Sequence, residues 1–344
     1  MSGGDGRNVD ARTGELSGEA APQRAPEARD TGGAAPHDVF EGTPSRRGDA
    51  PTYYDRPVLK EPVWIWAVPV YFFLGGAAGG ASVLGAAAQV LGRGRLDGLV
   101  ARCRVLAAVG TAAGSALLVY DLGRRDRFLN MLRVFRPTSA ISVGSWILAA
   151  SGGASGAAAV LGARRTRWLV PDAAGLAAGA LGGPLATYTG VLLADTSVPL
   201  WREGRRTLPV LFAASGLAGA TSLLSLADLD EDSERVVHRL DLAASAAELA
   251  LAVALEREVG RVESVGKPLK EGVSGALWKA STALGVASMA LSLPRGPSRA
   301  RNALSALLGA AGGLALRFAV FRAGFASARD ASATFDLQRS RSPE

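Results

Sequence analysis

Side chains that could bind a metal are scarce in this sequence of 344 residues. It contains one cysteine, Cys103, and two histidines, His37 and His238. A disulfide framework, a cysteine-rich zinc site and a cysteine-bound iron–sulfur cluster each need several thiols. A membrane-embedded b-type haem normally takes two axial histidines, and His37 lies in a polar segment. We therefore expect the chain itself to bind no haem and no other redox metal.

Two acidic residues are candidates for proton transfer. Glu248 lies near the middle of one long apolar stretch, and Asp121 closes another. An ionisable group in the middle of a membrane is costly unless it is paired or hydrated, so it is a functional candidate. Glu248 is thus either a proton relay or the partner of a buried arginine such as Arg317.

The elements that would position these residues are eight apolar stretches, separated by short clusters of charge. Only 20% of the residues are charged and 48% are hydrophobic, and the mean hydropathy is +0.18. About 20 apolar residues cross a bilayer as a helix, and a spanning segment must satisfy its backbone hydrogen bonds internally. We predict an all-α, multi-pass protein of the cell membrane with eight transmembrane helices. They are expected near Val63–Leu91, Cys103–Leu122, Ser139–Leu161, Trp168–Ala194, Leu208–Ala227, Val236–Leu255, Val273–Leu293 and Ala303–Phe321.

Polar segments flank this membrane domain on both sides. Residues 1–60 are rich in Gly, Ala, Pro and charged residues and contain no apolar run. Such a segment cannot bury enough surface to fold, so we predict a disordered tail. The membrane domain is expected over residues 61–325, and residues 326–344 form a polar C-terminal tail.

An internal repeat relates the first and fifth predicted helices at an offset of 140 residues. It predicts two four-helix units in the same membrane orientation, at about 61–195 and 205–325. The small residues in these helices are expected to allow close helix packing. The matched pairs include Pro69 with Pro209, Phe72 with Phe212, Gly76 with Gly216, Gly79 with Gly219 and Ser82 with Ser222.

The basic residues anchor helices rather than bind nucleic acid. The net charge is +7, and all but four of the 38 basic residues are arginine. The arginines cluster at the ends of the apolar stretches, as expected of membrane-surface anchors. The loops of the two membrane sides carry similar numbers of them, and the basic residues that flank the domain favour both termini on the inside.

Several separated segments resemble the NrfD, or polysulfide reductase, family of membrane subunits, in the order found there. The loop after the second predicted helix is similar to the family segments D-L-G-R-P-x-R-F and S-P-M-S-x-G-S-W. Later segments are similar to Y-T-G-x-L-L, P-x-W and L-P-x-L-F. These segments are Asp121–Phe128, Arg136–Trp146, Tyr188–Leu193, Pro199–Trp201 and Leu208–Phe212, with Arg125 in place of the usual proline.

The resemblance implies a membrane anchor that exchanges electrons between a membrane quinone, menaquinone by expectation, and a four-cluster iron–sulfur subunit. That subunit serves a molybdopterin catalytic subunit, in enzymes of the polysulfide reductase or formate dehydrogenase type that act in anaerobic respiration. This chain would then be a quinone-reactive or non-catalytic subunit of an oxidoreductase.

The resemblance also implies a quinone site. Tyr188 matches the family's quinone-contacting tyrosine, and a phenol can both donate and accept a hydrogen bond. Some members supply an asparagine and a histidine from the first helix, where this chain has Val68 and Tyr71. Tyr71 can replace the hydrogen bond of the histidine, but Val68 cannot replace an amide. We expect Tyr188, Tyr71 and Trp64 at the quinone and Glu248 and Asp121 in proton transfer.

Partner docking is expected at the loop after the second helix, through Arg124, Arg127 and Arg136. Asp121, Arg124 and Arg127 could instead line the mouth of the quinone site, or form a solvated charge cluster. Two other functions stay open for the whole chain. Two repeated units around polar groups also describe secondary transporters, and the valine at position 68 is compatible with a purely structural anchor.

Overall fold

The computed structural model describes residues 8–9, 16–17, 58–60, 62–122, 125–163, 169–293 and 298–339, without the side chains of residues 8–9, 16–17, 125–127 and 129. Residues 1–50 and 51–344 form separate compact units. In the first unit, strands β1 (Asn8–Val9) and β2 (Leu16–Ser17) pair antiparallel, with Val9 opposite Leu16. A ladder of this length is not stable by itself. Residues 58–60, which form no helix or strand, are also described, and the rest of the tail predicted to be disordered over residues 1–60 lies outside the described residues.

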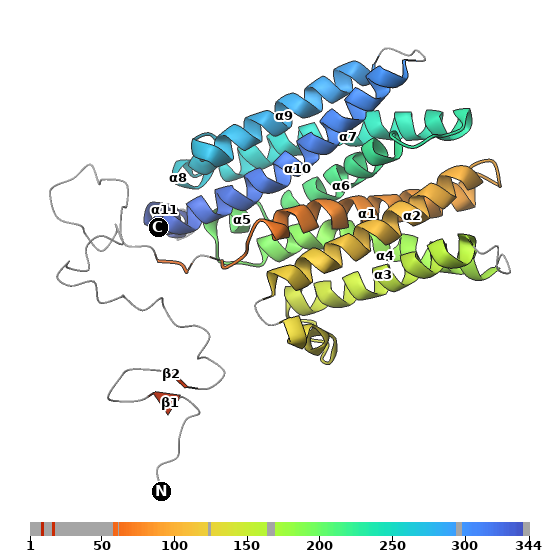
Figure 1. Cartoon of the computed structure of the whole chain (residues 1–344). Coiled ribbons are helices and arrows are strands. Elements are labelled where there is room, and N and C mark those ends of the chain that lie inside the picture. Colours follow the sequence, from red (N-terminus) through yellow and green to blue (C-terminus); the bar gives the residue numbers. More distant parts are fainter. Residues whose placement is uncertain are drawn as a thin grey trace, which may run out of the picture. The chain divides into compact units, whose positions relative to one another are not determined.

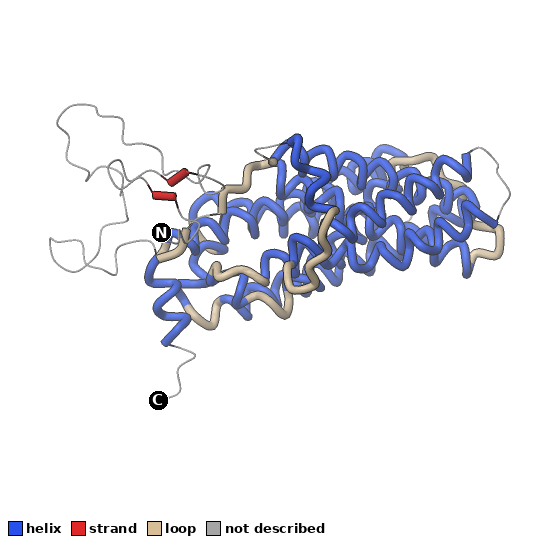
Figure 2. Tube along the Cα trace, turned by 90° about the horizontal axis from the view of Figure 1, so that it is seen from below, coloured by secondary structure: helices blue, strands red, loops and turns tan. Residues whose placement is uncertain are grey.

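Eight long helices run side by side in the second unit (Figures 1 and 2). Short helices connect or follow them at one end of the bundle. The long helices are α1 (Ala67–Leu91), α2 (Asp97–Asp121), α3 (Ala140–Ala163), α4 (Leu169–Ala194), α6 (Leu208–Leu224), α7 (Glu231–Val259), α9 (Gly272–Ser292) and α10 (Arg299–Arg329). The short ones are η3 (Arg125–Leu132), α5 (Pro199–Glu203), α8 (Glu263–Gly266), η4 (Lys267–Leu269) and α11 (Ala331–Arg339).

Each predicted membrane stretch coincides with one long helix, but only five helices are long and apolar enough to cross a membrane by length and composition. These five are α1, α2, α3, α4 and α10, and α6 is a shorter apolar helix of 17 residues. The chain is therefore all-helical in its main unit, with several potential membrane spans.

Several helix ends differ from the predicted ends because charged residues are capped or packed. Helix α7 begins at Glu231 instead of Val236, because the side chain of Asp230 accepts a hydrogen bond from the backbone N–H of Ser233 at 2.9 Å. This bond and one from the Ser233 hydroxyl hold the pKa of Asp230 below its ordinary value. Helix α10 runs on to Arg329, and α11 lies within the predicted C-terminal tail, where it buries Ala333 and Leu337.

Helix α1 is the centre of the bundle and packs against α2, α4, α6 and α10. It is lined by small residues, which let neighbouring backbones approach. A Cβ atom on Gly79 would lie 2.5 Å from the carbonyl oxygen of Gly182 in α4, and one on Gly80 would lie 2.8 Å from that of Gly216 in α6. Glycine is therefore needed on two sides of this helix.

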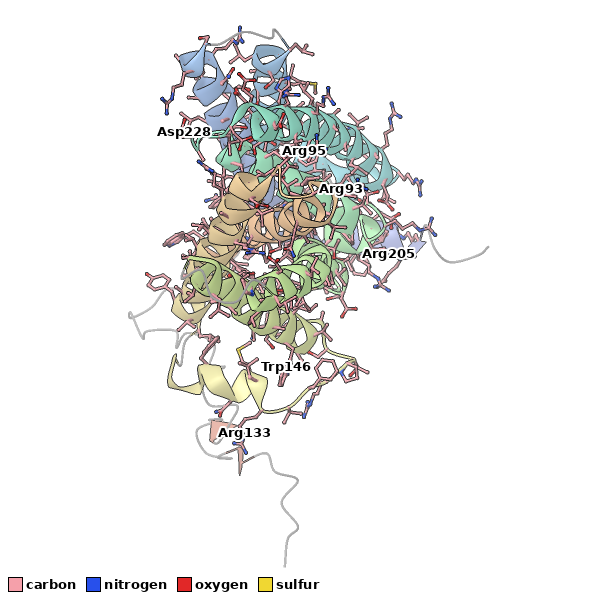
Figure 3. All side chains as sticks on the ribbon, turned by 90° about the vertical axis from the view of Figure 1, so that its right-hand side faces the viewer. Arg93, Arg95, Arg133, Trp146, Arg205 and Asp228 are labelled. Carbon is pink, nitrogen blue, oxygen red and sulfur yellow. The ribbon has the colours of Figure 1, made fainter. Side chains whose placement is uncertain are left out.

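The bundle has two ends, which we name by one residue each. At the Asp121 end, α1 and α6 begin and α2 and α4 end. At the Asp228 end lie the connections from α1 to α2 and from α6 to α7. Figure 3 looks onto the Asp228 end, where Arg93, Arg95 and Asp228 are labelled.

Candidate functional site

Tyr71 and Tyr188, the two predicted quinone-site tyrosines, meet inside the bundle. The hydroxyl of Tyr71 in α1 donates a hydrogen bond of 3.1 Å to the hydroxyl of Tyr188 in α4. Tyr71 is 1% exposed and Tyr188 is 8% exposed. Because Tyr188 accepts this bond, its own proton points away from Tyr71 and can be donated to another acceptor.

Two glycines make room for the tyrosine rings. A Cβ atom on Gly144 of α3 would overlap the ring of Tyr188, and one on Gly114 of α2 would lie 3.0 Å from Cδ2 of Tyr71. Gly144 belongs to the segment Ser142–Trp146. All four helices α1 to α4 thus shape the surroundings of the pair.

Trp64 lies next to the same core without touching the tyrosine hydroxyls. Its ring stacks on Trp201 of α5, with the ring centroids 5.9 Å apart. Trp201 is completely buried, and its indole N–H donates a hydrogen bond of 2.9 Å to the carbonyl of Val320 in α10. A Cβ atom on Gly324 would overlap the indole ring of Trp201. Trp64 is therefore fixed at the Asp121 end of the bundle by an aromatic partner.

Asp121 has a defined structural partner. Its Oδ1 atom accepts a hydrogen bond of 3.2 Å from the backbone N–H of Ile65, just before α1. Trp66 and Tyr120 pack nearby, with ring centroids 6.1 Å apart. The carboxyl group thus joins the end of α2 to the start of α1, the helix that carries Tyr71.

Glu248 lies apart from the tyrosines, in a small cavity of about 20 Å³ between α6, α7, α9 and α10. We call this space the Glu248 cavity. Arg317 of α10 is close enough to interact electrostatically with Glu248. The Arg317 side chain is completely buried and its Nη2 donates to the carbonyl of Phe212 at 2.9 Å. Its guanidinium carbon also lies 3.8 Å from the centre of the Phe212 ring.

Two nitrogen atoms of Arg317, Nε and Nη1, have no hydrogen-bond partner among the described residues. The nearby Ser215 hydroxyl interacts with Glu248. Buried polar groups of this kind usually bind an ordered water. The Glu248 cavity has room for about one water molecule by its volume.

Asp241 is another acidic residue on α7 that lies inside the bundle, and the sequence did not predict it as a site residue. It is 7% exposed and accepts hydrogen bonds from Thr221 at 2.8 Å and Ser222 at 3.4 Å. Asp241 and Glu248 are seven residues apart, so they lie on the same face of α7 two turns apart. That spacing was the signal available in the sequence.

The predicted docking arginines are only partly described. Arg124 and the side chain of Arg127 lie outside the described residues. Arg136 is exposed at the Asp121 end, and its backbone N–H donates to the Ser142 hydroxyl at 3.0 Å. Arg133 is also exposed there (Figure 3).

The predicted site residues therefore form two groups. Tyr71, Tyr188, Trp64 and Asp121 lie toward the Asp121 end, and Glu248 lies with Arg317 within the second set of helices. No cluster of three or more His, Cys, Asp or Glu residues that could hold a metal is found within the described part of the chain.

Short segments that are far apart in the sequence pack on one another. Gly190 follows Tyr188 by two residues, and a Cβ atom on it would lie 2.7 Å from the Cα atom of Pro209. The Tyr188–Leu193 segment thus fits closely onto the start of α6, and Gly144 fits onto Tyr188 itself.

Comparison with known proteins identifies the family of the chain. No curated protein matches it. The family model described as "Polysulphide reductase, NrfD" matches residues 57–328, which include all eight long helices almost completely and both groups of site residues. The chain therefore belongs to the NrfD, or polysulphide reductase, family.

Proposed function

We propose that this chain is the quinone-interacting membrane anchor of an oxidoreductase complex. NrfD proteins are membrane-integral subunits of such complexes. The observation that carries the proposal is the buried hydrogen bond between the hydroxyls of Tyr71 and Tyr188. It joins the family's tyrosine to the residue that stands where some members have a histidine.

The tyrosine pair fits a quinone carbonyl as hydrogen-bond acceptor. Tyr188 has a free hydroxyl proton, and the bond from Tyr71 polarises this hydroxyl and strengthens it as a donor. Val68 is 4% exposed and has no side-chain amide. The two tyrosines therefore supply one hydrogen-bond donor to the quinone, where some family members can also supply an asparagine. A quinol releases two electrons and two protons when it is oxidised. Tyr188 orients the ring oxygen, and Tyr71 holds Tyr188 in position.

All eight long helices cross the membrane in this proposal, including the three that are less apolar. Three polar side chains of α7 are directed into the bundle, since Asp241, Ser245 and Glu258 are each less than 9% exposed while Val253 is 46% exposed. Helix α9 likewise buries Ser281 and Ser288, which bond to Gly312 and Ser305 of α10. Polar residues that face the interior lower the mean hydropathy of a helix without exposing charge to lipid.

The two four-helix units are proposed to be α1 to α4 and α6, α7, α9 and α10. Residues that the repeat equates lie against one another where the units meet. A Cβ atom on Gly76 would lie 3.4 Å from the Cα atom of Gly216, and the rings of Phe72 and Phe212 are 6.1 Å apart. Contact between equivalent residues is what a two-fold axis between two repeats produces.

Electrons would pass to a four-cluster iron–sulfur subunit, which serves a molybdopterin subunit of the polysulfide reductase or formate dehydrogenase type, and the quinone would be menaquinone. These partners are taken from the family. The docking face is proposed at the Asp121 end, around Arg124, Arg127 and Arg136, because the tyrosine pair lies nearest that end. Asp121 and Glu248 are proposed to transfer protons.

Tyr188→Phe tests the quinone site. Removing the hydroxyl should lower quinone-linked electron transfer of the purified complex about tenfold or more, because the donor to the quinone is lost. Assembly and dye-linked activity of the soluble subunits should stay unchanged. Tyr71→Phe should have a smaller effect in the same direction, because Tyr188 keeps its own proton.

Tyr120→Phe is the matched control, since this ring is 50% exposed near the same end of the bundle. It should leave quinone turnover intact. Full quinone turnover in Tyr188→Phe would instead favour a structural anchor. Recovery of the chain alone in mild detergent, without iron or quinone, would favour a transporter.

A further inference from the structure

The second four-helix unit contains a polar pocket that opens at the Asp228 end. We call it the His238 pocket. It has a volume of about 320 Å³ and lies between the end of α6, the start of α7, the end of α9 and the start of α10. Its polar lining includes Asp228, Glu234, His238, Asp241, Asn302 and Ser305. A pocket of this size and polarity at helix ends admits water.

Hydroxyl groups continue from the His238 pocket toward the Glu248 cavity. The Ser305 hydroxyl donates to the carbonyl of Ser288 at 2.8 Å, and the hydroxyls of Thr221 and Ser222 donate to Asp241. Gly309 lies between the two spaces. A Cβ atom on it would be 2.6 Å from the Ser222 hydroxyl and 3.0 Å from the Ser288 hydroxyl. A side chain there would therefore displace both hydroxyls, which are buried between the helices.

Glu248, which lines the cavity, interacts with Arg317 and with the Ser215 hydroxyl. Arg317 is completely buried, and its Nε and Nη1 atoms have no hydrogen-bond partner among the described residues. A buried cation with free N–H groups beside a carboxylate calls for water between them. The two unpartnered nitrogen atoms of Arg317 are the observation that points to a bound water beside Glu248.

The first unit holds an ion pair beside a smaller space at the corresponding place. Arg104 of α2 forms an ion pair of 2.7 Å with Asp172 of α4 and a hydrogen bond of 3.0 Å to Gln89 of α1. The space next to Gln89 and Arg104 has a volume of about 10 Å³ and is lined by no acidic residue among those described. The two units thus differ in their polar interior.

We propose that the second unit holds a hydrated proton path that opens at the Asp228 end and runs past Asp241 to Glu248 and Arg317. Each step moves one proton between a water molecule and a carboxylate. The charged groups that face Glu248 are Arg317 from α10 and Asp241 from its own helix, and α6 contributes the Ser215 hydroxyl. The proposal rests on the proposed eight-helix membrane arrangement and deepens the role of Glu248.

Silver ions test whether water reaches the Glu248 cavity. The full-length chain carries Cys103→Ser, so that the introduced cysteine is its only thiol, and either Ser245→Cys or Ser155→Cys. Both serines are buried in mid-helix, Ser245 in the lining of the Glu248 cavity and Ser155 in the lining of the smaller space of the first unit. Silver added at the Asp228 end should block the thiol of Ser245→Cys about tenfold faster than that of Ser155→Cys, because only a hydrated thiol ionises readily. Equal rates would overturn the proposal.

Dicyclohexylcarbodiimide tests the proton connection, because this apolar reagent modifies protonated carboxyl groups within membranes. In oriented vesicles, modification of Glu248 should fall about tenfold when the pH rises at the Asp228 end, and should not respond to the pH at the Asp121 end. Glu248→Gln should remove the label. Asp241→Asn should slow the response, and Asp172→Asn in the first unit should not.

The proposal would be overturned if the extent of Glu248 modification followed the pH at the Asp121 end, or if Glu248 were not modified at any pH.

Neither the silver measurement nor the carbodiimide measurement involves a quinone. Tyr188→Phe should leave both unchanged, so that failure of the proton path can be told apart from failure of the quinone site.

Discussion

At the scale of single residues, the candidate quinone site depends on glycines that leave room for its tyrosine rings. Tyr188 occupies the space in which a Cβ atom of residue 144 would lie, and Tyr71 lies against Gly114. A hydrogen bond between two buried phenols needs both rings within a few tenths of an ångström of their places. Gly144 is therefore a positioning residue for Tyr188.

Gly144→Ala should displace Tyr188 and weaken its bond to Tyr71. We expect quinone-linked turnover to fall, and the free energy of unfolding to fall by about 1–3 kcal/mol, as for other overpacked sites. Turnover and thermal unfolding of the detergent-solubilised complex measure the two effects. Gly153→Ala is the control on the same helix, because a Cβ atom there meets nothing within 4 Å. Equal behaviour of the two variants would contradict the role given to Gly144.

At the scale of elements, the contact between α1 and α6 holds the two halves of the bundle together. The backbones approach at Gly76, Gly80 and Gly216, and the Arg317 guanidinium lies against the same crossing. In lipid, the association of helices depends on close packing rather than on hydrophobic burial. A side chain at this crossing would separate the helices and disturb the bond from Arg317 to Phe212.

Gly216→Ala should therefore destabilise the bundle. The added Cβ atom would lie 2.7 Å from the carbonyl oxygen of Gly76, which is backbone and cannot move away alone. We expect a loss of about 1–3 kcal/mol, seen as a lower unfolding temperature in detergent. Gly183→Ala is the comparison, since open space surrounds that position. Unchanged stability of Gly216→Ala would show that α1 and α6 separate easily.

At the scale of the whole molecule, the two ends of the bundle have different roles in the proposed function. The Asp121 end carries the tyrosine pair, the short helices and the exposed arginines Arg133 and Arg136. The Asp228 end carries the His238 pocket. Electrons would leave at the Asp121 end, and protons would enter or leave at the Asp228 end. Electron transfer and proton transfer would then involve opposite sides of the membrane.

Arg136→Glu should weaken association with the iron–sulfur subunit about two- to tenfold at low salt, because a rim charge acts mainly on the rate of association. The effect should shrink as salt is added. Arg93→Glu at the Asp228 end is the matched control and should leave the association unchanged (Figure 3). Co-purification at two salt concentrations measures both. An equal effect of the two substitutions would contradict docking at the Asp121 end.

The family, the helical class and the places of the eight long helices could be read from the amino-acid order, because apolar length and short motifs are local properties. The sequence also predicted Tyr71, Tyr188 and Glu248 as site residues. The helix ends at Glu231 and Arg329 differed from expectation, because an Asp230 cap and burial against α11 and its neighbours extend helices beyond their apolar parts.

Which of these residues meet depends on how the helices pack. The bond between Tyr71 and Tyr188 joins residues 117 positions apart, and that between Arg317 and Phe212 joins residues 105 apart. An aspartate such as Asp241 is usually found on the surface, but here Thr221 and Ser222 of α6 donate hydrogen bonds to it inside the bundle. Burial and partnership depend on how helices pack against each other, and a linear pattern of residue types does not encode that packing directly.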